Sequence, residues 1–231
     1  MRLILVRHGQ TPSNVAGAMD TARPGALLTD LGGRQADALV APLAYPRLAG
    51  VYASVLFRAQ LTARPLALQH GLRVAVRGGL EEILAGDELE MRSDDHAADT
   101  YATCIERWLD GDLADHLPGA PDGHDFLRRY DAAIAGVAAE HRRNACVVVV
   151  SHGAAIRVWA TLRARGLTPA HRRHGQLMNT GAVTLDGSPE DGWELVSWAT
   201  EPLGGRLPGD RAEPGVGQDV IRSEPSMAQN V

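Results

Sequence analysis

The chain has 231 residues, of which 45% are hydrophobic and 22% are charged, values close to those of an average soluble globular domain. Its 23 basic and 28 acidic residues give a formal net charge of -5, so it lacks the positive surface that binding to a nucleic-acid backbone requires. Every basic residue is an arginine. The missing lysine excludes a phosphate-binding loop of the Walker type and any enzyme that forms a Schiff base through lysine.

Cysteine content and apolar runs indicate the compartment. Cys104 and Cys146 are too few for a disulfide framework or a cysteine-built zinc site. The apolar residues 1–6 are followed at once by Arg7 and His8, which makes them too short for a signal-peptide core, and no later run is long enough for a membrane span. We therefore expect a cytoplasmic protein with neither a membrane nor a nucleic acid as partner.

The first 165 residues alternate short apolar runs with stretches of helical spacing. The apolar runs predict strands over residues 2–6, 50–53, 72–76 and 146–150. The last of these is an unbroken valine run, which is typical of a strand covered on both faces. Helical spacing predicts helices over residues 29–43, 56–69, 126–141 and 153–163. This alternation predicts a mainly parallel sheet with helices on both faces.

The first two predicted helices carry more specific expectations. The first is capped by Thr29 or Asp30, has a first turn weakened by a pair of glycines, and is closed by Pro46. In the second, Leu66 and Leu68 are among the residues expected to face the core.

The rest of the chain departs from the strand and helix alternation. Residues 86–123 are acidic and polar, and only residues 101–109 keep a helical pattern, so we interpret them as an insertion over the sheet. Residues 182–185 and 193–198 predict two late strands that pair. From residue 201 to residue 231, prolines, glycines and scattered charges predict a disordered tail. The folded domain is therefore expected to cover residues 1–200.

Two of the predicted strands end in almost the same way. Residues 5–9 read Leu-Val-Arg-His-Gly, and residues 149–153 read Val-Val-Ser-His-Gly. Parallel sheets bind ligands beyond the carboxyl ends of their strands, and a glycine there lets the backbone turn away while the histidine faces a pocket. A single histidine of this kind is more often structural than catalytic. Two on neighbouring central strands, one beside Arg7, indicate a functional site.

The segment at residues 7–14, Arg-His-Gly-Gln-Thr-Pro-Ser-Asn, resembles the signature of the histidine phosphatase superfamily, which includes the cofactor-dependent phosphoglycerate mutases. Three further segments resemble that family's pattern in the same order. They are the arginine segment at residues 54–63, the acid segment at residues 80–86 and the second histidine segment at residues 151–157. The resemblance covers roughly residues 2–200 and implies the family's three-layer α/β/α fold.

The resemblance also implies a role for each matched residue. His8 would be the nucleophile that forms a phosphohistidine, and Glu82 the acid that protonates the leaving group. Glu81 is the adjacent alternative, and the spacing to Gly86 favours Glu82. The phosphoryl group would be bound by arginine guanidinium groups and other donors, which carry its negative charge. These binding residues would be Arg7, Asn14, Arg58, His152 and Gly153.

No metal and no other cofactor are implied, because two arginines and a histidine supply the positive charge that Mg²⁺ would otherwise bring. His171 and His174 have a spacing that could bind a metal, but they flank two arginines and are better read as a solvated basic surface. The acidic side chains of the insertion are either a solvated face or a negative rim that repels polyanionic substrates. These are Asp87, Glu88, Glu90, Asp94, Asp95 and Asp99, opposed only by Arg92.

These observations predict a metal-independent phosphomonoesterase that acts on a small phosphorylated metabolite. One alternative is a phosphoglycerate mutase, although mutases of this family usually carry a longer insertion with extra basic residues. A second alternative is an inactive relative that binds a phosphorylated ligand. The physiological substrate and the oligomeric state stay open, with a homodimer as the assembly considered.

Overall fold

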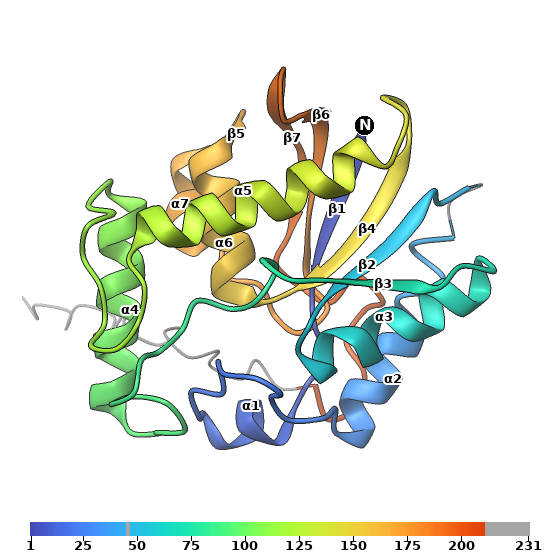
Figure 1. Cartoon of the computed structure of the whole chain (residues 1–231). Coiled ribbons are helices and arrows are strands. Elements are labelled where there is room, and N and C mark those ends of the chain that lie inside the picture. Colours follow the sequence, from blue (N-terminus) through green and yellow to red (C-terminus); the bar gives the residue numbers. More distant parts are fainter. Residues whose placement is uncertain (45–46, 211–231) are drawn as a thin grey trace, which may run out of the picture.

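The computed structural model describes residues 1–44 and 47–210. Within them, one mixed sheet has the strand order β3-β2-β4-β1-β6-β7-β5 (Figure 1). Strands β1 to β4 are mutually parallel, whereas β6 runs antiparallel to both β1 and β7. The strands are β1 (Arg2–Arg7), β2 (Gly50–Ser54), β3 (Val74–Arg77), β4 (Cys146–Ser151), β5 (Ala164–Arg165), β6 (Ala182–Ser188) and β7 (Gly192–Ala199).

Helices cover both faces of this sheet, as predicted. In β1, Leu3 and Leu5 join one hydrophobic core, while Ile4 and Val6 join the other. Successive residues of a strand point to opposite faces, so an unbroken apolar run is what a doubly covered strand requires. Figure 1 shows α2 and α3 on one face and α5 and α6 on the other. The helices are α1 (Pro12–Ala16), α2 (Asp30–Ala38), α3 (Phe57–Gln69), α4 (Asp95–Leu109), α5 (Gly123–Ala139), α6 (Gly153–Arg163) and α7 (Pro169–His174).

A row of aromatic side chains fixes the inserted helix α4 to the rest of the domain. Trp108 of α4 stacks on Phe126 of α5 at 5.8 Å, and Phe126 in turn contacts Tyr130 at 5.6 Å. Tyr130 then packs on Trp159 of α6, with ring centroids 5.5 Å apart. Aromatic pairs at these separations contribute beyond their buried area. The insertion is therefore tied to the helices that follow it in the chain.

Some predicted elements differ from the structure. Helix α4 is capped by Asp94 and begins at Asp95, six residues before the predicted start. The prediction missed these residues because they carry no helical pattern of apolar side chains. Thr29 caps α2, as one of the two alternatives proposed, but this helix ends at Ala38 rather than near residue 43. Pro46, expected to close that unit, lies outside the described residues. Leu68 is 67% exposed, so its inward assignment is wrong, whereas Leu66 is buried.

The predicted start of the disordered tail, at residue 201, is too early. Within residues 201–210, the amide of Leu203 donates to the carbonyl of Thr180 at 3.1 Å, and the side chain of Asp210 accepts from Gln35 of α2. Gly204 lies so close to Ala38 that a side chain at this position would collide with the helix. These ten residues are therefore part of the folded domain, and residues 211–231 lie outside the described part. No helix in the described chain is long and apolar enough to cross a bilayer.

Candidate active site

The ends of three parallel strands bring the two predicted histidines together. Arg7 of β1 pairs in register with Ser151 of β4, so His8 and His152 follow at the same level. Their ring centroids are 5.3 Å apart. At the end of β2, the Ser54 hydroxyl lies 2.9 Å from Nε2 of His152. The site thus forms at the carboxyl edge of the sheet, where open parallel sheets place their ligands.

The His8 ring is held as a neutral imidazole with its Nε2 lone pair available. Nδ1 lies 2.8 Å from the carbonyl of Gly9, which places the ring proton on Nδ1, and Arg58 donates from Nε to Nε2 at 3.1 Å. Burial, followed by the charges of Arg58 and Arg7, holds the pKa of His8 well below its usual value of 6.5. The amide of Gly9 donates to Thr62 at 2.9 Å, which fixes the turn that follows.

His152 has one ring nitrogen without a partner. Because the Ser54 hydroxyl accepts from the amide of Leu56, its own hydrogen can be given to Nε2 of His152, which leaves the ring proton on Nδ1. Nδ1 is buried and has no hydrogen-bond partner among the described residues. Burial and then Arg58 hold the pKa of His152 well below 6.5. A buried donor left unsatisfied at a candidate site indicates a place for an acceptor.

Two buried arginines flank His8. Arg7 donates from Nη1 to the carbonyl of Leu177 at 2.5 Å. Arg58 donates from Nη2 to the carbonyl of Asp20 at 2.7 Å, and its Nη1 lies 3.5 Å from the Asp20 carboxylate. Nη1 makes no hydrogen bond within the described residues. Two guanidinium groups beside one imidazole form a binding place for an oxyanion.

Glu82 and Glu81 lie on different sides of the chain. The Glu82 carboxylate accepts from the amides of Ala155 at 2.7 Å and Ala154 at 3.2 Å, so it occupies the N-terminus of α6, where the helix dipole favours negative charge. Glu81 instead pairs with Arg23 and lies 3.8 Å from Nη1 of Arg129. Of the two adjacent acids, Glu82 alone lines the pocket described next.

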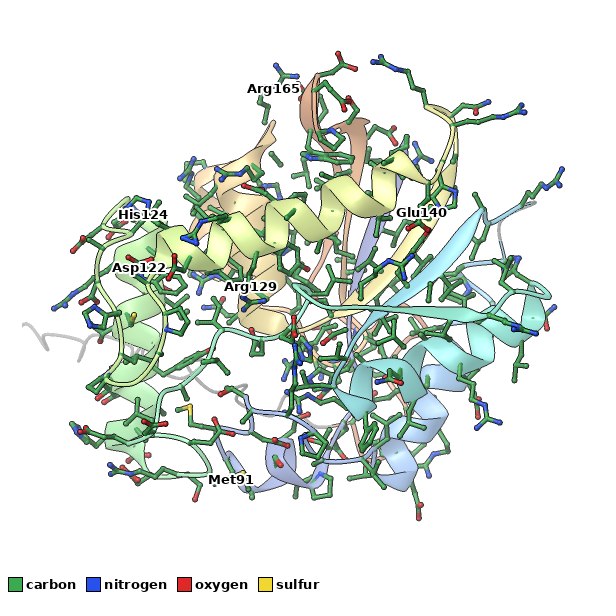
Figure 2. The ribbon with its side chains drawn as sticks, viewed as in Figure 1. Met91, Asp122, His124, Arg129, Glu140 and Arg165 are labelled. Atoms are coloured by element: carbon green, nitrogen blue, oxygen red, sulfur yellow. The ribbon has the colours of Figure 1, made fainter. Side chains whose placement is uncertain are left out.

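Arg129 of α5 fixes the backbone of this acid segment. It donates to the carbonyls of Gly79, Glu81 and Glu82 at 2.9, 2.9 and 2.7 Å. Figure 2 shows Arg129 beneath α5, facing the middle of the molecule, whereas His124 lies at the outer end of the helix. The sequence patterns did not single out Arg129 as a residue of the site, because its partners are distant in the chain.

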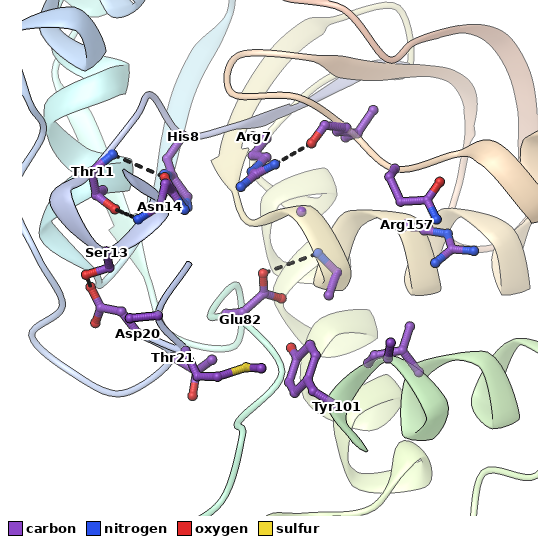
Figure 3. A pocket seen from close by; sticks show the side chains of 18 of the residues that line it. Arg7, His8, Thr11, Ser13, Asn14, Asp20, Thr21, Glu82, Tyr101 and Arg157 are labelled. Carbon is purple, nitrogen blue, oxygen red and sulfur yellow. Dashed lines mark hydrogen bonds between the residues drawn. The ribbon is translucent and has the colours of Figure 1, made fainter. Parts of the chain in front are cut away.

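These elements enclose one pocket (Figure 3). Of the predicted site residues, Arg7, His8, Asn14, Arg58, Glu82 and Gly153 line it, while His152 lies buried beside His8 and is not among the lining residues. The side-chain oxygen of Asn14 accepts from the amide of Thr11 and from Asn179, which leaves its amino group as the donor. The opposite wall comes from α4 and α6, and its residues, including Tyr101 and Arg157, were not predicted.

The acidic insertion contains side chains with structural roles. The Glu90 carboxylate accepts from the amides of Thr21 and Ala22 at 2.9 and 3.0 Å and from the Thr21 hydroxyl. Asp94 caps α4 and pairs with Arg92 at 2.8 Å. These two carboxylates are therefore used to hold the loops around the pocket. Glu88, Asp95 and Asp99 are exposed.

The two histidines considered as metal ligands lie in α7. There Nδ1 of His171 accepts from the amide of Thr168 at 3.0 Å, and the His171 ring stacks on Trp198 at 5.7 Å. This histidine thus has a helix-capping role. Within residues 1–44 and 47–210, no cluster of three or more histidine, cysteine, aspartate or glutamate side chains could hold a metal ion.

A family model described as the histidine phosphatase superfamily (branch 1) matches residues 3–201. The chain belongs to this superfamily. Among solved structures, a mycobacterial glucosyl-3-phosphoglycerate phosphatase superposes with a TM-score of 0.71 at 27% identity, covering 87% of this chain and 99% of that one. The resemblance that the sequence motifs indicated is confirmed, as is the predicted three-layer fold.

Two curated relatives differ in their length and in their description. A PE-PGRS family protein of Mycobacterium tuberculosis (strain ATCC 25618 / H37Rv) is 37% identical over 212 residues, which are 86% of this chain but 36% of that protein. The histidine phosphatase chain thus spans about a third of that relative's length. A probable phosphoglycerate mutase of Yersinia enterocolitica is 27% identical over 88% of this chain and 93% of its own length.

Proposed function

We propose that the protein is a metal-independent phosphoric monoester hydrolase that acts on a small phosphorylated substrate through a phosphohistidine at His8. The observation that carries this proposal is the neutral His8 ring, with its Nε2 lone pair beside two buried arginines. A neutral imidazole can attack phosphorus, and two guanidinium groups can stabilise the charge on the transferring oxygens. Membership of a phosphatase superfamily supports the same reaction.

Substrate binding would rearrange one contact. In the substrate-free site, Arg58 donates to the same Nε2 atom that must attack phosphorus. A phosphate dianion is a stronger acceptor than a neutral imidazole, so the guanidinium would turn to the phosphate and release the lone pair. The amino group of Asn14, Nδ1–H of His152 and the amide of Gly153 would donate to the remaining phosphate oxygens.

The reaction would proceed in two displacements. His8 Nε2 bonds to phosphorus while the ester P–O bond breaks, and the departing alkoxide takes up a proton delivered by the Glu82 carboxyl group. In the second step, water attacks phosphorus, Glu82 takes a proton from it, and the N–P bond breaks to release inorganic phosphate. The two arginines supply the positive charge in both steps, so no metal is required.

The main alternative is a phosphoglycerate mutase, and the similarity to the probable mutase of Yersinia supports it. A mutase must keep His8 phosphorylated and hold the carboxylate of its substrate. The only lining arginine on the wall opposite His8, within the described residues, is Arg157, and it is paired with Glu106 at 2.8 Å. This pairing favours hydrolysis over isomerisation. The second alternative is an inactive protein that only binds a phosphorylated ligand. Such a protein would not need both His8 and Glu82, so the presence of both residues argues against it.

The test uses the purified full chain with EDTA and a panel of phosphomonoesters. The panel includes 3-phosphoglycerate, with and without 2,3-bisphosphoglycerate, and both free phosphate and isomerised product are measured. We expect phosphate release that is insensitive to EDTA, and a phosphoryl group trapped on the enzyme by rapid quenching. In His8→Ala both should vanish while the circular dichroism spectrum stays native. Isomerisation without phosphate release would establish the mutase instead, and undiminished turnover in His8→Ala would refute the nucleophile.

A further inference from the structure

The wall of the pocket opposite His8 decides which alcohol can leave. Phosphoryl transfer places the attacking and leaving oxygens roughly in line, so the leaving group lies across the phosphorus from the nucleophile. In Figure 3, His8 and Asn14 lie on one side of the pocket, Glu82 lies between, and Tyr101 and Arg157 lie on the other side. If hydrolysis through His8 is correct, the alcohol portion of the substrate must contact that far wall.

The part of the far wall that helix α4 contributes is largely apolar. Its residues there are Tyr101, Ala102 and Ile105, followed by Glu106. The hydroxyl of Tyr101 donates to the carbonyl of Ile83 at 2.9 Å, which fixes the ring as a wall of the pocket. Surfaces of this kind pack against carbon rather than against charge.

The single cation on the far wall is already neutralised by described residues. Arg157 of α6 makes an ion pair from Nη1 to the carboxylate of Glu106 at 2.8 Å, and it donates from Nη2 to the carbonyl of Arg172 at 2.8 Å. The Arg157 side chain is 6% exposed, whereas that of Glu106 is 52% exposed. A ligand entering from solvent therefore reaches the carboxylate more easily than the guanidinium.

The balance of charge over the described lining supports the same conclusion. The lining has three arginines and three carboxylates: Arg7, Arg58, Arg157, Asp20, Glu82 and Glu106. Arg7 and Arg58 flank His8 and are needed for the phosphoryl group. A second anion on the leaving group would have to displace Glu106 from a buried arginine, or lie beside an exposed carboxylate, and both cost free energy.

We infer that the substrate is a phosphomonoester of an uncharged alcohol, and that Glu106 is a specificity residue which disfavours leaving groups carrying a carboxylate or a second phosphate. The inference rests on the proposed hydrolysis through His8 and narrows its substrate class. Glu106 belongs to the insertion, whereas the proposed catalytic residues lie outside it. Selectivity for the substrate therefore resides in a different segment of the chain from catalysis.

The test compares two substrates of nearly equal size, racemic glycerol 3-phosphate and 3-phosphoglycerate, in which a hydroxymethyl group replaces a carboxylate. We measure kcat/KM for phosphate release from each, and from phenyl phosphate as a reference ester. The wild-type protein should prefer glycerol 3-phosphate on the order of tenfold, the effect of one like charge near a partly screened carboxylate. Glu106→Gln keeps an acceptor for Arg157 and removes the charge, so the preference should fall to about twofold or less.

The matched control is Glu88→Gln, which removes the same charge from an exposed position of the insertion that does not line the pocket. It should keep the wild-type preference. Equal or better hydrolysis of 3-phosphoglycerate by the wild-type protein would overturn the inference, as would an unchanged preference in Glu106→Gln. Both results are distinct from failure of the proposed function, in which phenyl phosphate also releases no phosphate.

Discussion

At the scale of single residues, two adjacent glutamates have different surroundings. The Glu82 carboxylate accepts from two amides at the start of α6 and faces the pocket, whereas Glu81 is taken up by Arg23 and Arg129. Their separation follows from the backbone, since consecutive side chains in an extended segment point to opposite sides. Of the two glutamates, only Glu82 is therefore placed to donate a proton beside a phosphorus atom bound in the pocket.

Replacing each glutamate by glutamine tests this assignment. Glu82→Gln can still accept from an α6 amide but carries no transferable proton. The kcat for an alkyl phosphate should fall by about 10²- to 10⁴-fold, whereas p-nitrophenyl phosphate, whose leaving group needs no proton, should lose less than about tenfold. Glu81→Gln is the control, and any fall in kcat that it causes should be similar for the two substrates. Steady-state kinetics on the two esters measures the difference, and equal losses in Glu82→Gln would contradict the general-acid role.

Local sequence patterns indicated some of the residues that line or support the pocket and not others. The spacing from Glu82 to Gly86 distinguished the two acids, and the histidine-glycine pairs marked the strand ends, because both patterns lie within a few residues. Arg129 has its carbonyl partners 47 to 50 residues away, so no local pattern could reveal it. Asp20, which lies beside Arg58, is 38 residues from it and was missed for the same reason.

At the scale of elements, helix α2 is set against the turn after β1 by a close backbone approach. A side chain built at Gly32 would lie 2.1 Å from the carbonyl oxygen of Gln10, and one at Gly9 would lie 2.6 Å from the carbonyl oxygen of Gly32. The amide of Gln10 also donates to the side-chain oxygen of Gln35 in this helix at 2.8 Å. The glycine that weakens the first turn of α2 is thus what lets the helix support the His8 turn.

The adjacent glycines of α2 allow a matched comparison. Gly32→Ala forces the helix away from the residue 9–10 turn, and we expect it to lower the free energy of unfolding by about 1–3 kcal/mol. It should also reduce activity, because His8 lies in the displaced turn. Gly33→Ala places its methyl group in open space and should raise stability by up to about 1 kcal/mol. Urea unfolding of both variants measures this, and similar stabilities in the two would rule out the close approach as the cause.

Elements were predictable where burial is continuous and unpredictable where polar residues begin or end them. The valine run of β4 and the apolar run of β1 gave their strands to within a residue, since both faces are covered. Helix α4 was found only in its second half, because it begins with Asp95 and His96, which are polar and exposed. Leu68 was misplaced because residues two apart in a helix differ by about 200° in direction, so Leu66 and Leu68 cannot both face the core.

At the scale of the whole molecule, the site depends on the complete fold. His8 and His152 are 144 positions apart and meet because β1 and β4 are paired in the middle of the sheet, while the far wall combines α6 with helix α4 of the insertion between β3 and α5. Both histidines are buried and lie among arginines, so each is held neutral. Unfolding returns both rings to water. The active site should consequently contribute to the pH dependence of global stability.

The sign of this dependence follows from the direction of the two pKa shifts. Each histidine has a folded-state pKa well below 6.5, so as the pH falls below about 6.5 the unfolded chain takes up a proton at each ring and the folded chain does not. The unfolded state then binds more protons, and stability declines on acidification until the pH reaches the folded-state pKa. The contribution is fully present above about pH 7.5 and is lost progressively as the pH falls below about 6.5 toward the folded-state pKa.

We expect the free energy of unfolding to fall by up to about 1.4 kcal/mol per histidine for each pH unit below about 6.5. Urea unfolding at a series of pH values from 7.5 to 5.0 measures the slope, which includes contributions from other groups. The double variant His8→Asn/His152→Asn removes the two buried rings and should have a clearly shallower slope, whereas His116→Asn, at an exposed histidine, should keep that of the wild-type protein. If the double variant retained the full slope, proton uptake by the two active-site rings could not be its source.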